Sequence, residues 1–270
     1  MATKTREEYT RANLEAWNEV APRHAEHNNA ALFEAFKDPK HIELEGDILA
    51  LLRRIDVRGK SIIHLCCNNG RETLSLRNMG AERCVGIDAA ESFLTHGREM
   101  IRIAGAENQV ELIQSDIYDL PRHLKGQFDI VLITIGVLSW MPELKPVFDV
   151  IQSLLKPEGQ LVMEDMHPIL QTYDEDPAGG PSSIQTSYFG KDIWEETTGL
   201  DYFGHEVYES KPNYSFMHRM DEILMAGIDC GLQLRFFKEL DYDISNFCSD
   251  LADSPTKPPL GFVILMEQTP

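Results

Sequence analysis

SIIHLCCNNGRE, residues 61–72, is the stretch that decides the fold of this 270-residue chain. An apolar strand runs into a tight turn, and a helix opens at once behind it. That arrangement brings backbone N–H groups and the positive end of a helix dipole close to a ligand. The turn is unusual because two cysteines and two asparagines stand where a nucleotide-binding loop usually has glycines. Which ligand this turn can hold therefore decides most of the function.

Loops that hold a pyrophosphate follow the pattern G-x-G-x-x-G, because the glycines let the backbone approach the phosphates closely. Here Cys66 and Asn68 replace two of those glycines. Asparagine is the non-glycine residue that best tolerates a left-handed φ angle, so the bend remains feasible at Asn68 or Asn69. The turn therefore favours a nucleoside without phosphates over a dinucleotide.

Short apolar runs alternate with helical segments from residue 61 onward. We expect strands at 62–66, 84–87, 110–114, 128–134 and 160–164, and helices at 71–79, 90–104 and 144–155. Alternation at this pitch predicts a parallel, doubly wound sheet with right-handed crossovers. A helix at 220–229 and strands at 232–237 and 260–266 follow. The whole pattern predicts an α/β, Rossmann-like sheet of seven strands, mostly parallel with an antiparallel last strand.

The chain is long enough for one large domain, and we expect a single domain over residues 1–270. Its parts are an N-terminal helical cap (1–58), a cofactor-binding core (59–165), an inserted lid after strand five (166–218), and a C-terminal helix with strands (219–270). The cap has amphipathic segments at 7–20 and 44–55. The lid is rich in Pro, Gly, Tyr and Asp and is too long for a structureless loop.

The bulk properties exclude several classes of function. A formal charge of −19 argues against nucleic acid as a partner, because phosphates would be repelled. The cysteines are odd in number and lack metal-ligand spacing, which favours reduced thiols and no metal site. The N-terminus is polar and has no apolar core segment, so we expect no signal peptide, and no apolar run approaches the length of a membrane span. We therefore expect a cytoplasmic monomer or homodimer with no membrane partner.

Two acidic residues end consecutive predicted strands. Asp88 ends the second strand and Asp116 the third, and ligands of open α/β sheets lie outside the carboxyl ends of strands. A carboxylate at the first position can accept both hydroxyls of a ribose. A side-chain acceptor at the second can meet the exocyclic amine of adenine. Each acid alone is more often a helix cap or a solvated loop residue, but together they indicate a nucleoside site.

Residues 61–165 resemble the class I S-adenosylmethionine-dependent methyltransferases. More narrowly, the chain resembles a largely uncharacterised branch of small bacterial-type methyltransferases with a CNNGR-type loop. The phrases that carry this likeness are HLCCNNGRETLSL (64–76), VGID (85–88), IGVLSWMPEL (135–144), LLKPEG (154–159), EDMHP (164–168) and, more weakly, YSFMHRMDEILMAGIDCGL (214–232). The loop differs from the commonest family form in lacking its first two glycines and in having His64 where an acidic residue is usual.

The resemblance implies S-adenosyl-L-methionine as cofactor and S-adenosyl-L-homocysteine as product. It implies methionine contacts from Cys66, Asn68 and Gly70, ribose and adenine contacts from Asp88, Ala89, Asp116 and Ile117, and Thr134 and Ile135 beside the sulfonium. The simplest alternative for His64 is a hydrogen-bonded strand histidine beneath the site. The implied activity is methyl transfer. The segments expected to cover the site favour an O, N or S atom of a small molecule as the acceptor, and a protein acceptor remains possible.

A general base is needed only if the acceptor atom carries a proton at neutral pH. His167 and His218 are the candidates, although either could simply anchor the lid. Trp17, Trp140, Tyr188 and Tyr214 are candidates for the substrate pocket, although lid aromatics often form a core of their own. Trp140 is the strongest of these because it follows strand four directly.

Two other functions remain open from the sequence. The chain could be a non-catalytic, regulatory binder of S-adenosylmethionine or S-adenosylhomocysteine, or an NAD-dependent oxidoreductase. An open cavity beyond the sulfonium favours the enzyme, and a cavity filled by Trp140, His167 or lid aromatics favours the binder.

Overall fold

A computed structural model describes residues 4–174, 182–204, 206–245, 247 and 249–269 of the chain. Cys248 and the lid residues 175–181 and 205 lie outside the described residues. The central sheet has seven strands in the order β10-β11-β5-β4-β1-β2-β3. Their bounds are β1 Ser61–Leu65, β2 Arg83–Asp88, β3 Val110–Gln114, β4 Phe128–Ile133, β5 Leu155–Met166, β10 Leu232–Leu240 and β11 Gly261–Gln268.

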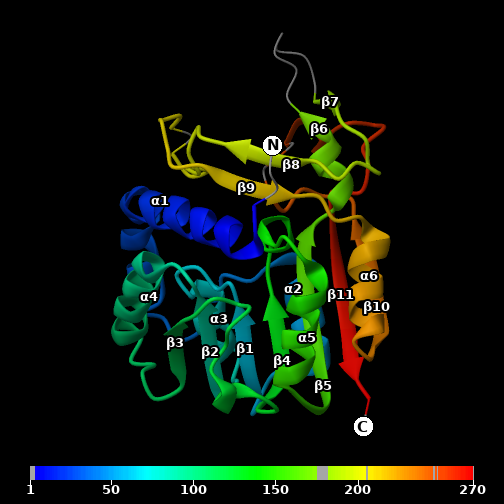
Figure 1. Ribbon diagram of the computed structural model, residues 1–270. Coiled ribbons are helices and arrows are strands. Elements are labelled where there is room, and N and C mark those ends of the chain that lie inside the picture. The colour runs from blue at the N-terminus through cyan, green and yellow to red at the C-terminus, as the bar shows by residue number, and fades with distance from the viewer. Residues whose placement is uncertain (1–3, 175–181, 205, 246, 248, 270) are drawn as a thin grey trace.

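The strand directions confirm the predicted fold class. Strands β1 to β5 pair in parallel, with Ile62 of β1 lying between Cys84 of β2 and Ile130 of β4. Strand β11 runs antiparallel to both of its neighbours, β5 and β10. It is therefore the one reversed strand of this sheet, as Figure 1 shows in red.

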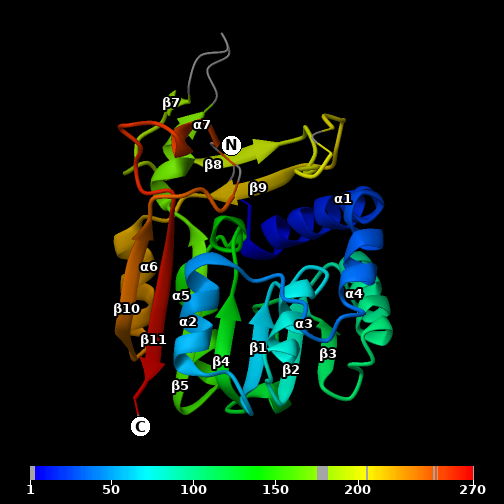
Figure 2. The same cartoon turned by 180° about the vertical axis from the view of Figure 1, so that it is seen from behind.

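Helices cover both faces of the sheet (Figures 1 and 2). On one face lie α2 (Gly46–Ile55), α3 (Arg71–Asn78) and α4 (Glu91–Ile103), and on the other lie α5 (Leu144–Leu154) and α6 (Met220–Asp229). Alternate residues of each strand enter two separate apolar clusters, as the period of a strand requires. Among the described helices, none combines the length and apolar character needed to cross a bilayer.

The carboxyl ends of the strands are covered by two segments far apart in sequence. Helix α1 (Arg6–Ala35) crosses above them, and a hairpin of β8 (Ile193–Glu196) and β9 (Asn213–Phe216) lies against α1 (Figure 1). The Asn13 side chain joins them, because its Nδ2 donates to the Tyr214 carbonyl at 2.8 Å and its Oδ1 accepts from the Tyr214 N–H at 2.7 Å. The lid also contains η3 (Pro168–Thr172), and a short ladder pairs β6 (Tyr173–Asp174) with β7 (Ser183–Ile184).

Helix α1 is much longer than its apolar periodicity predicts. The periodic face ends at Val20, yet the helix continues through Pro22 to Ala35. Its polar second half is held by single buried side chains, His24 and Leu32, so no continuous apolar stripe marks it. Figure 2 shows the helix turning after its first half, where Pro22 removes a backbone donor.

Two glycines allow the turn after β1 to pack tightly. A Cβ atom on Gly97 of α4 would lie 2.4 Å from the Asn69 carbonyl oxygen. A Cβ atom on Gly86 of β2 would lie 2.7 Å from the Cys67 sulfur. Any larger residue at either position would displace the turn, so these glycines fix its depth between α4 and the sheet.

Glu164 on β5 is a buried acid whose ionisation costs stability. Burial raises its pKa to about 7, with the nearby Asp47 and Glu45 carboxylates adding to the effect, although the Ile48 N–H opposes it. Between about pH 4.5 and about pH 7 the unfolded chain has lost this proton and the folded chain retains it, so stability falls as pH rises.

We therefore expect Glu164→Gln to gain stability relative to the parent as pH rises. The difference in the free energy of unfolding should be small near about pH 5 and should reach up to about 3 kcal/mol near about pH 8. Urea unfolding at the two pH values measures it. The exposed Glu111 provides a charge-matched control as Glu111→Gln. A gain that does not change with pH would contradict the argument.

Candidate cofactor and acceptor site

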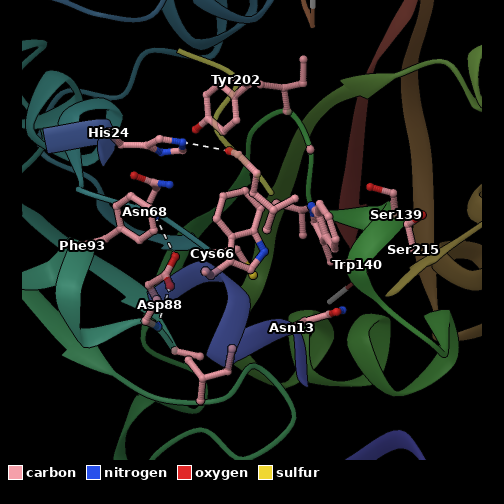
Figure 3. Close-up of a pocket in the computed structure, with 18 of the residues that line it drawn as sticks. Asn13, His24, Cys66, Asn68, Asp88, Phe93, Ser139, Trp140, Tyr202 and Ser215 are labelled. Carbon is pink, nitrogen blue, oxygen red and sulfur yellow. Dashed lines mark hydrogen bonds between the residues drawn. The ribbon is translucent and has the colours of Figure 1, made fainter. Parts of the chain in front are cut away.

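A cavity of about 1480 Å³ lies at the carboxyl ends of β1, β2, β3 and β4, beneath α1 and beside the hairpin. Figure 3 shows it with side chains from the turn after β1, from α1 and from the hairpin around it. The structure brings eight of the nine predicted cofactor residues to its wall: Cys66, Asn68, Asp88, Ala89, Asp116, Ile117, Thr134 and Ile135. Gly70 stands behind the wall, with φ of 73° and no room for a Cβ beside Leu112.

The turn after β1 alternates between left- and right-handed backbone. Cys66 and Asn68 have φ of 54° and 51°, and Gly70 completes the series. The sequence analysis placed a bend at Asn68 or Asn69, and it lies at Asn68; the bend at Cys66 was not predicted. The turn is held from both sides, since the Cys67 N–H donates to the Ile87 carbonyl at 2.8 Å and Asn69 N–H to Asn68 Oδ1 at 2.8 Å. These bonds offset the cost of left-handed backbone at non-glycine residues.

Asp88 links the turn to the end of β2. Its Oδ2 accepts from the Asn68 N–H at 2.8 Å, and its Oδ1 accepts from the Ala90 N–H at 2.9 Å (Figure 3). Burial raises the pKa of Asp88 to about 6, although the backbone donors oppose it, so the group is ionised at neutral pH. Each carboxylate oxygen keeps a second lone pair. Asp88 can therefore bind a diol while it continues to hold the turn.

Asp116 lies in a more open setting. It is exposed, and its Oδ1 accepts from the Tyr118 N–H at 2.9 Å, which shapes the loop after β3. Ile117 beside it is buried. The pair thus offers a carboxylate oxygen and an apolar surface next to each other, as recognition of a flat base with an amino group requires.

His64 lies beneath the cavity as a structural bridge, which agrees with the simplest sequence interpretation. Its Nδ1 is 3.0 Å from Thr73 Oγ1 on α3, and its Nε2 is 3.0 Å from Thr134 Oγ1 at the end of β4. Burial lowers the pKa of His64 to about 4, so the imidazole is neutral. A neutral ring can donate to one hydroxyl and accept from the other, and it thereby sets the orientation of Thr134.

Asp165 is a buried acid that holds the loop beside the cavity, and the sequence interpretation missed it. Its carboxylate accepts four backbone N–H groups: Gly136 at 2.7 Å, Val137 at 3.2 Å, Leu138 at 3.0 Å and Met166 at 2.8 Å. Burial raises its pKa, although these donors oppose the rise. The bonds clamp the loop that carries Thr134, Ile135 and Trp140. The rule that acids at strand ends are functional would have found it.

The part of the cavity beyond the predicted cofactor residues has an aromatic wall. Trp17 of α1 and Trp140 of η2 (Leu138–Trp140) meet edge to face with centroids 5.3 Å apart. Ser139 and Ser215 lie near each other on the Trp140 side (Figure 3). His24, Phe93 and Tyr202 form the opposite side. The predicted pocket residues Trp17 and Trp140 are thus brought together at the cavity.

Neither predicted histidine lines the cavity. His167 follows Met166, which does, and strand alternation turns it to the other side. There its Nδ1 accepts from the Ile169 N–H at 3.1 Å, and its Nε2 lies 3.3 Å from Glu239 Oε1. His218 Nε2 donates to the Met141 carbonyl at 2.6 Å and supports the loop from outside. Burial lowers the pKa of both histidines. This geometry argues against either histidine as the general base.

Tyr188 and Tyr214 are likewise placed away from the cavity. The Tyr188 hydroxyl accepts from the Met220 N–H at 2.8 Å, at the start of α6. Tyr214 is buried against Tyr9 on one face of the hairpin, and its neighbour Ser215 faces the cavity instead. The sequence analysis assigned Tyr214 to the lid without predicting this strand, and strand alternation turns Ser215 instead of Tyr214 toward the cavity.

Burial raises the pKa of the Cys66 thiol, and the Asp88, Asp116 and Asp165 carboxylates add to the rise. The thiol is therefore protonated and a weak nucleophile. Within the described residues, no group of three or more His, Cys, Asp or Glu side chains is arranged to hold a metal ion.

Asp165→Asn tests the clamp on the loop after β4. The variant keeps the side-chain shape but turns an NH₂ group toward backbone N–H donors, leaving some of them unpaired in a buried place. We expect the free energy of unfolding to fall by about 1–3 kcal/mol in urea titrations. Exposed Asp241→Asn is the control, and an equal loss in both variants would contradict the clamp.

The chain matches a family model and several curated proteins. A family model described as a methyltransferase domain matches residues 56–204. The chain is 32% identical over 123 residues to demethylmenaquinone methyltransferase of Lactococcus lactis, covering 44% of this chain and 48% of that protein. It is 32% identical over 130 residues to ribosomal protein L11 methyltransferase of Vibrio campbellii, covering 48% of this chain and 40% of that protein. The chain thus spans about half the length of these curated relatives or less.

A solved structure agrees at the level of the fold. An S-adenosylmethionine dependent methyltransferase from Mesorhizobium loti superposes with a TM-score of 0.59 at 18% identity, covering 81% of this chain and 96% of that one. The residues that the family model matches contain β1 to β5, the turn after β1 and both acids at the ends of β2 and β3. Since that match extends over more than half of the residues, the chain belongs to the methyltransferase-domain family.

Proposed function

We propose that this protein is an S-adenosylmethionine-dependent methyltransferase acting on an O, N or S atom of a small molecule. The observation that carries the proposal is the alignment of three features on one cavity wall. They are a turn unsuited to pyrophosphate, the ionised Asp88 at the end of β2, and the exposed Asp116 at the end of β3. This order suits, in turn, an amino-acid tail, a ribose and an adenine.

The residues present fit the cofactor in chemistry and in space. Asp88 has free lone pairs for the ribose hydroxyls, and Asp116 with Ile117 offers an acceptor and an apolar face for the base. Pockets for a single small ligand measure about 300–1000 Å³. A cavity of about 1480 Å³ accommodates a cofactor and an acceptor side by side.

The chain's own contribution to the reaction is positioning and exclusion of water. The bound cofactor supplies an electrophilic methyl group on a sulfonium. His64 orients Thr134, and Asp165 clamps the loop that leads to Trp140, so the wall beside the methyl group is rigid. Trp17 and Trp140 exclude water from the same region. Holding reacting atoms about 3–3.5 Å apart in such a setting supplies several kcal/mol of the barrier reduction.

A small acceptor is favoured by the covering segments. Helix α1 and the hairpin are joined through Asn13 and Tyr214 and cover the strand ends, so an acceptor is reached from within a cavity. The relatives are named for demethylmenaquinone and for ribosomal protein L11, so family membership alone leaves the acceptor class open. The net charge of −19 disfavours RNA.

The non-catalytic alternative predicts a filled space beyond the sulfonium. The aromatic side chains here line an open cavity, and His167 is turned away from it. That arrangement favours the enzyme. Calorimetric titration with S-adenosylmethionine, S-adenosylhomocysteine and NAD tests the proposal, followed by a search for S-adenosylhomocysteine release with phenols, amines, thiols and carboxylic acids. Binding of NAD without S-adenosylmethionine would overturn it.

Asp88→Asn should weaken binding of S-adenosylmethionine by about tenfold or more at neutral pH, because an amide offers fewer acceptor lone pairs to a diol. In the parent protein, affinity should also fall as pH decreases through about 6, where Asp88 becomes protonated. The variant has no carboxylate to titrate, so its affinity should stay level between about pH 5 and about pH 7. Parallel pH profiles for the two proteins would contradict the assigned role.

A further inference from the structure

The two faces of the β8–β9 hairpin contact different parts of the molecule. Paired residues on antiparallel strands point to the same side, so Glu195 shares a face with Tyr214, and Trp194 shares the other face with Ser215. The Tyr214 face packs on Tyr9 of α1. The other face lines the cavity through Trp194, Glu196 and Ser215. The hairpin therefore presents an indole, a carboxylate and a hydroxyl to whatever enters beside the cofactor site.

Glu196 differs from most acids around the cavity. Asp88 accepts backbone N–H groups, Glu72 pairs with Arg71 at 2.6 Å, and Glu206 pairs with Arg23. Within the described part of the chain, no side chain forms an ion pair or hydrogen bond with the Glu196 carboxylate, although its backbone carbonyl accepts from Asn213. Glu196 is exposed, and Trp194, two residues earlier on the same face of the strand, is half-buried. A carboxylate without a partner side chain on the same face as an indole can attract a cation through its charge and through the face of the ring.

The net charge of the residues that line the cavity also favours a cationic ligand. Eight acidic residues line it among the described residues, against Arg11 and Arg71 as the basic ones, and Arg71 is already paired with Glu72. Such a wall repels carboxylates and phosphates and concentrates cations. An anionic acceptor would have to enter against this field.

We propose that the acceptor is a small molecule with an apolar body and an ammonium group, and that the ammonium group, which has no lone pair to receive a methyl, anchors the molecule between Trp194 and Glu196 on the hairpin. The apolar body lies against Trp17 and Trp140, and the hydroxyls of Ser139 and Ser215 meet its polar atoms. This inference rests on the proposed function, because it assigns the other end of the cavity to the cofactor. It selects amines over alcohols and acids of the same size.

The test uses the full-length protein saturated with S-adenosylhomocysteine and three probes of matched shape: 2-phenylethylamine, 2-phenylethanol and phenylacetate. Ligand-observed NMR measures their affinities. We expect the amine to bind about tenfold more tightly than the alcohol, and phenylacetate to bind most weakly. Equal affinities for the three probes, or tighter binding of the acid, would overturn the proposal.

A pair of neighbouring variants provides the control. Glu196→Gln should remove most of the preference for the amine and leave the affinity for the alcohol unchanged. Glu195→Gln removes the same charge from the opposite face of the same strand, toward Lys4, and should leave all three affinities unchanged. A similar loss in both variants would mean that net charge, and not the Trp194–Glu196 pair, selects the ligand.

The outcome separates this inference from the proposed function. A preliminary titration measures binding of S-adenosylhomocysteine to the parent and to both variants, and we expect the same affinity in all three. Failure of that ligand to bind the parent would contradict the methyltransferase proposal itself. Normal binding of it, with no preference among the three probes, would overturn the amine assignment alone.

Discussion

The site depends on a reversal of strand order in the middle of the sheet. From β1 the chain builds outward through β2 and β3, and it then returns to place β4 on the other side of β1. The helices that follow β1 and β4 therefore cover opposite faces and leave a crevice above the strand ends. Eight of the nine residues proposed for the cofactor line the cavity at these strand ends, and Gly70 stands behind its wall. His64 spans it from below, and its bonds to Thr73 and Thr134 tie the two diverging connections together.

Carboxylates at the ends of neighbouring strands serve different purposes because their surroundings differ. Asp165 is buried, and four backbone donors occupy it, so it acts on the loop after β4 and has little capacity left for a ligand. Asp88 has two backbone donors and faces the cavity, so it can hold the turn and a ligand at once. Asp116 is exposed and shapes only its own loop. The carboxylates at this edge of the sheet thus stabilise loops as well as offering acceptor oxygens to a ligand.

The strand and helix pattern of the core was predictable because it depends on local periodicity and on turn residues. The left-handed bend at Asn68 and the acids at two strand ends follow from the same local rules. The direction of side chains just outside a strand was not predictable. His167 and Tyr214 were assigned to the cavity, yet each sits one residue out of phase with it, since the inward face is set by distant packing. The polar half of α1 was missed because isolated buried residues hold it instead of an apolar stripe. Asp165 was missed although the rule that identified Asp88 applies to it equally.

The two hydrogen bonds between Asn13 and Tyr214 limit when α1 can dock on the hairpin during synthesis of the chain. The two residues are separated by 201 positions in the chain, so α1 can dock on the hairpin only after the five strands β1 to β5 between them have been synthesised. Until then, five parallel strands can pair and the turn after β1 can form, while the crevice above them stays uncovered. Ile244, Ser245 and Phe247 also line the cavity and follow the hairpin in sequence, so its wall is complete only after the segment before β11 has been made.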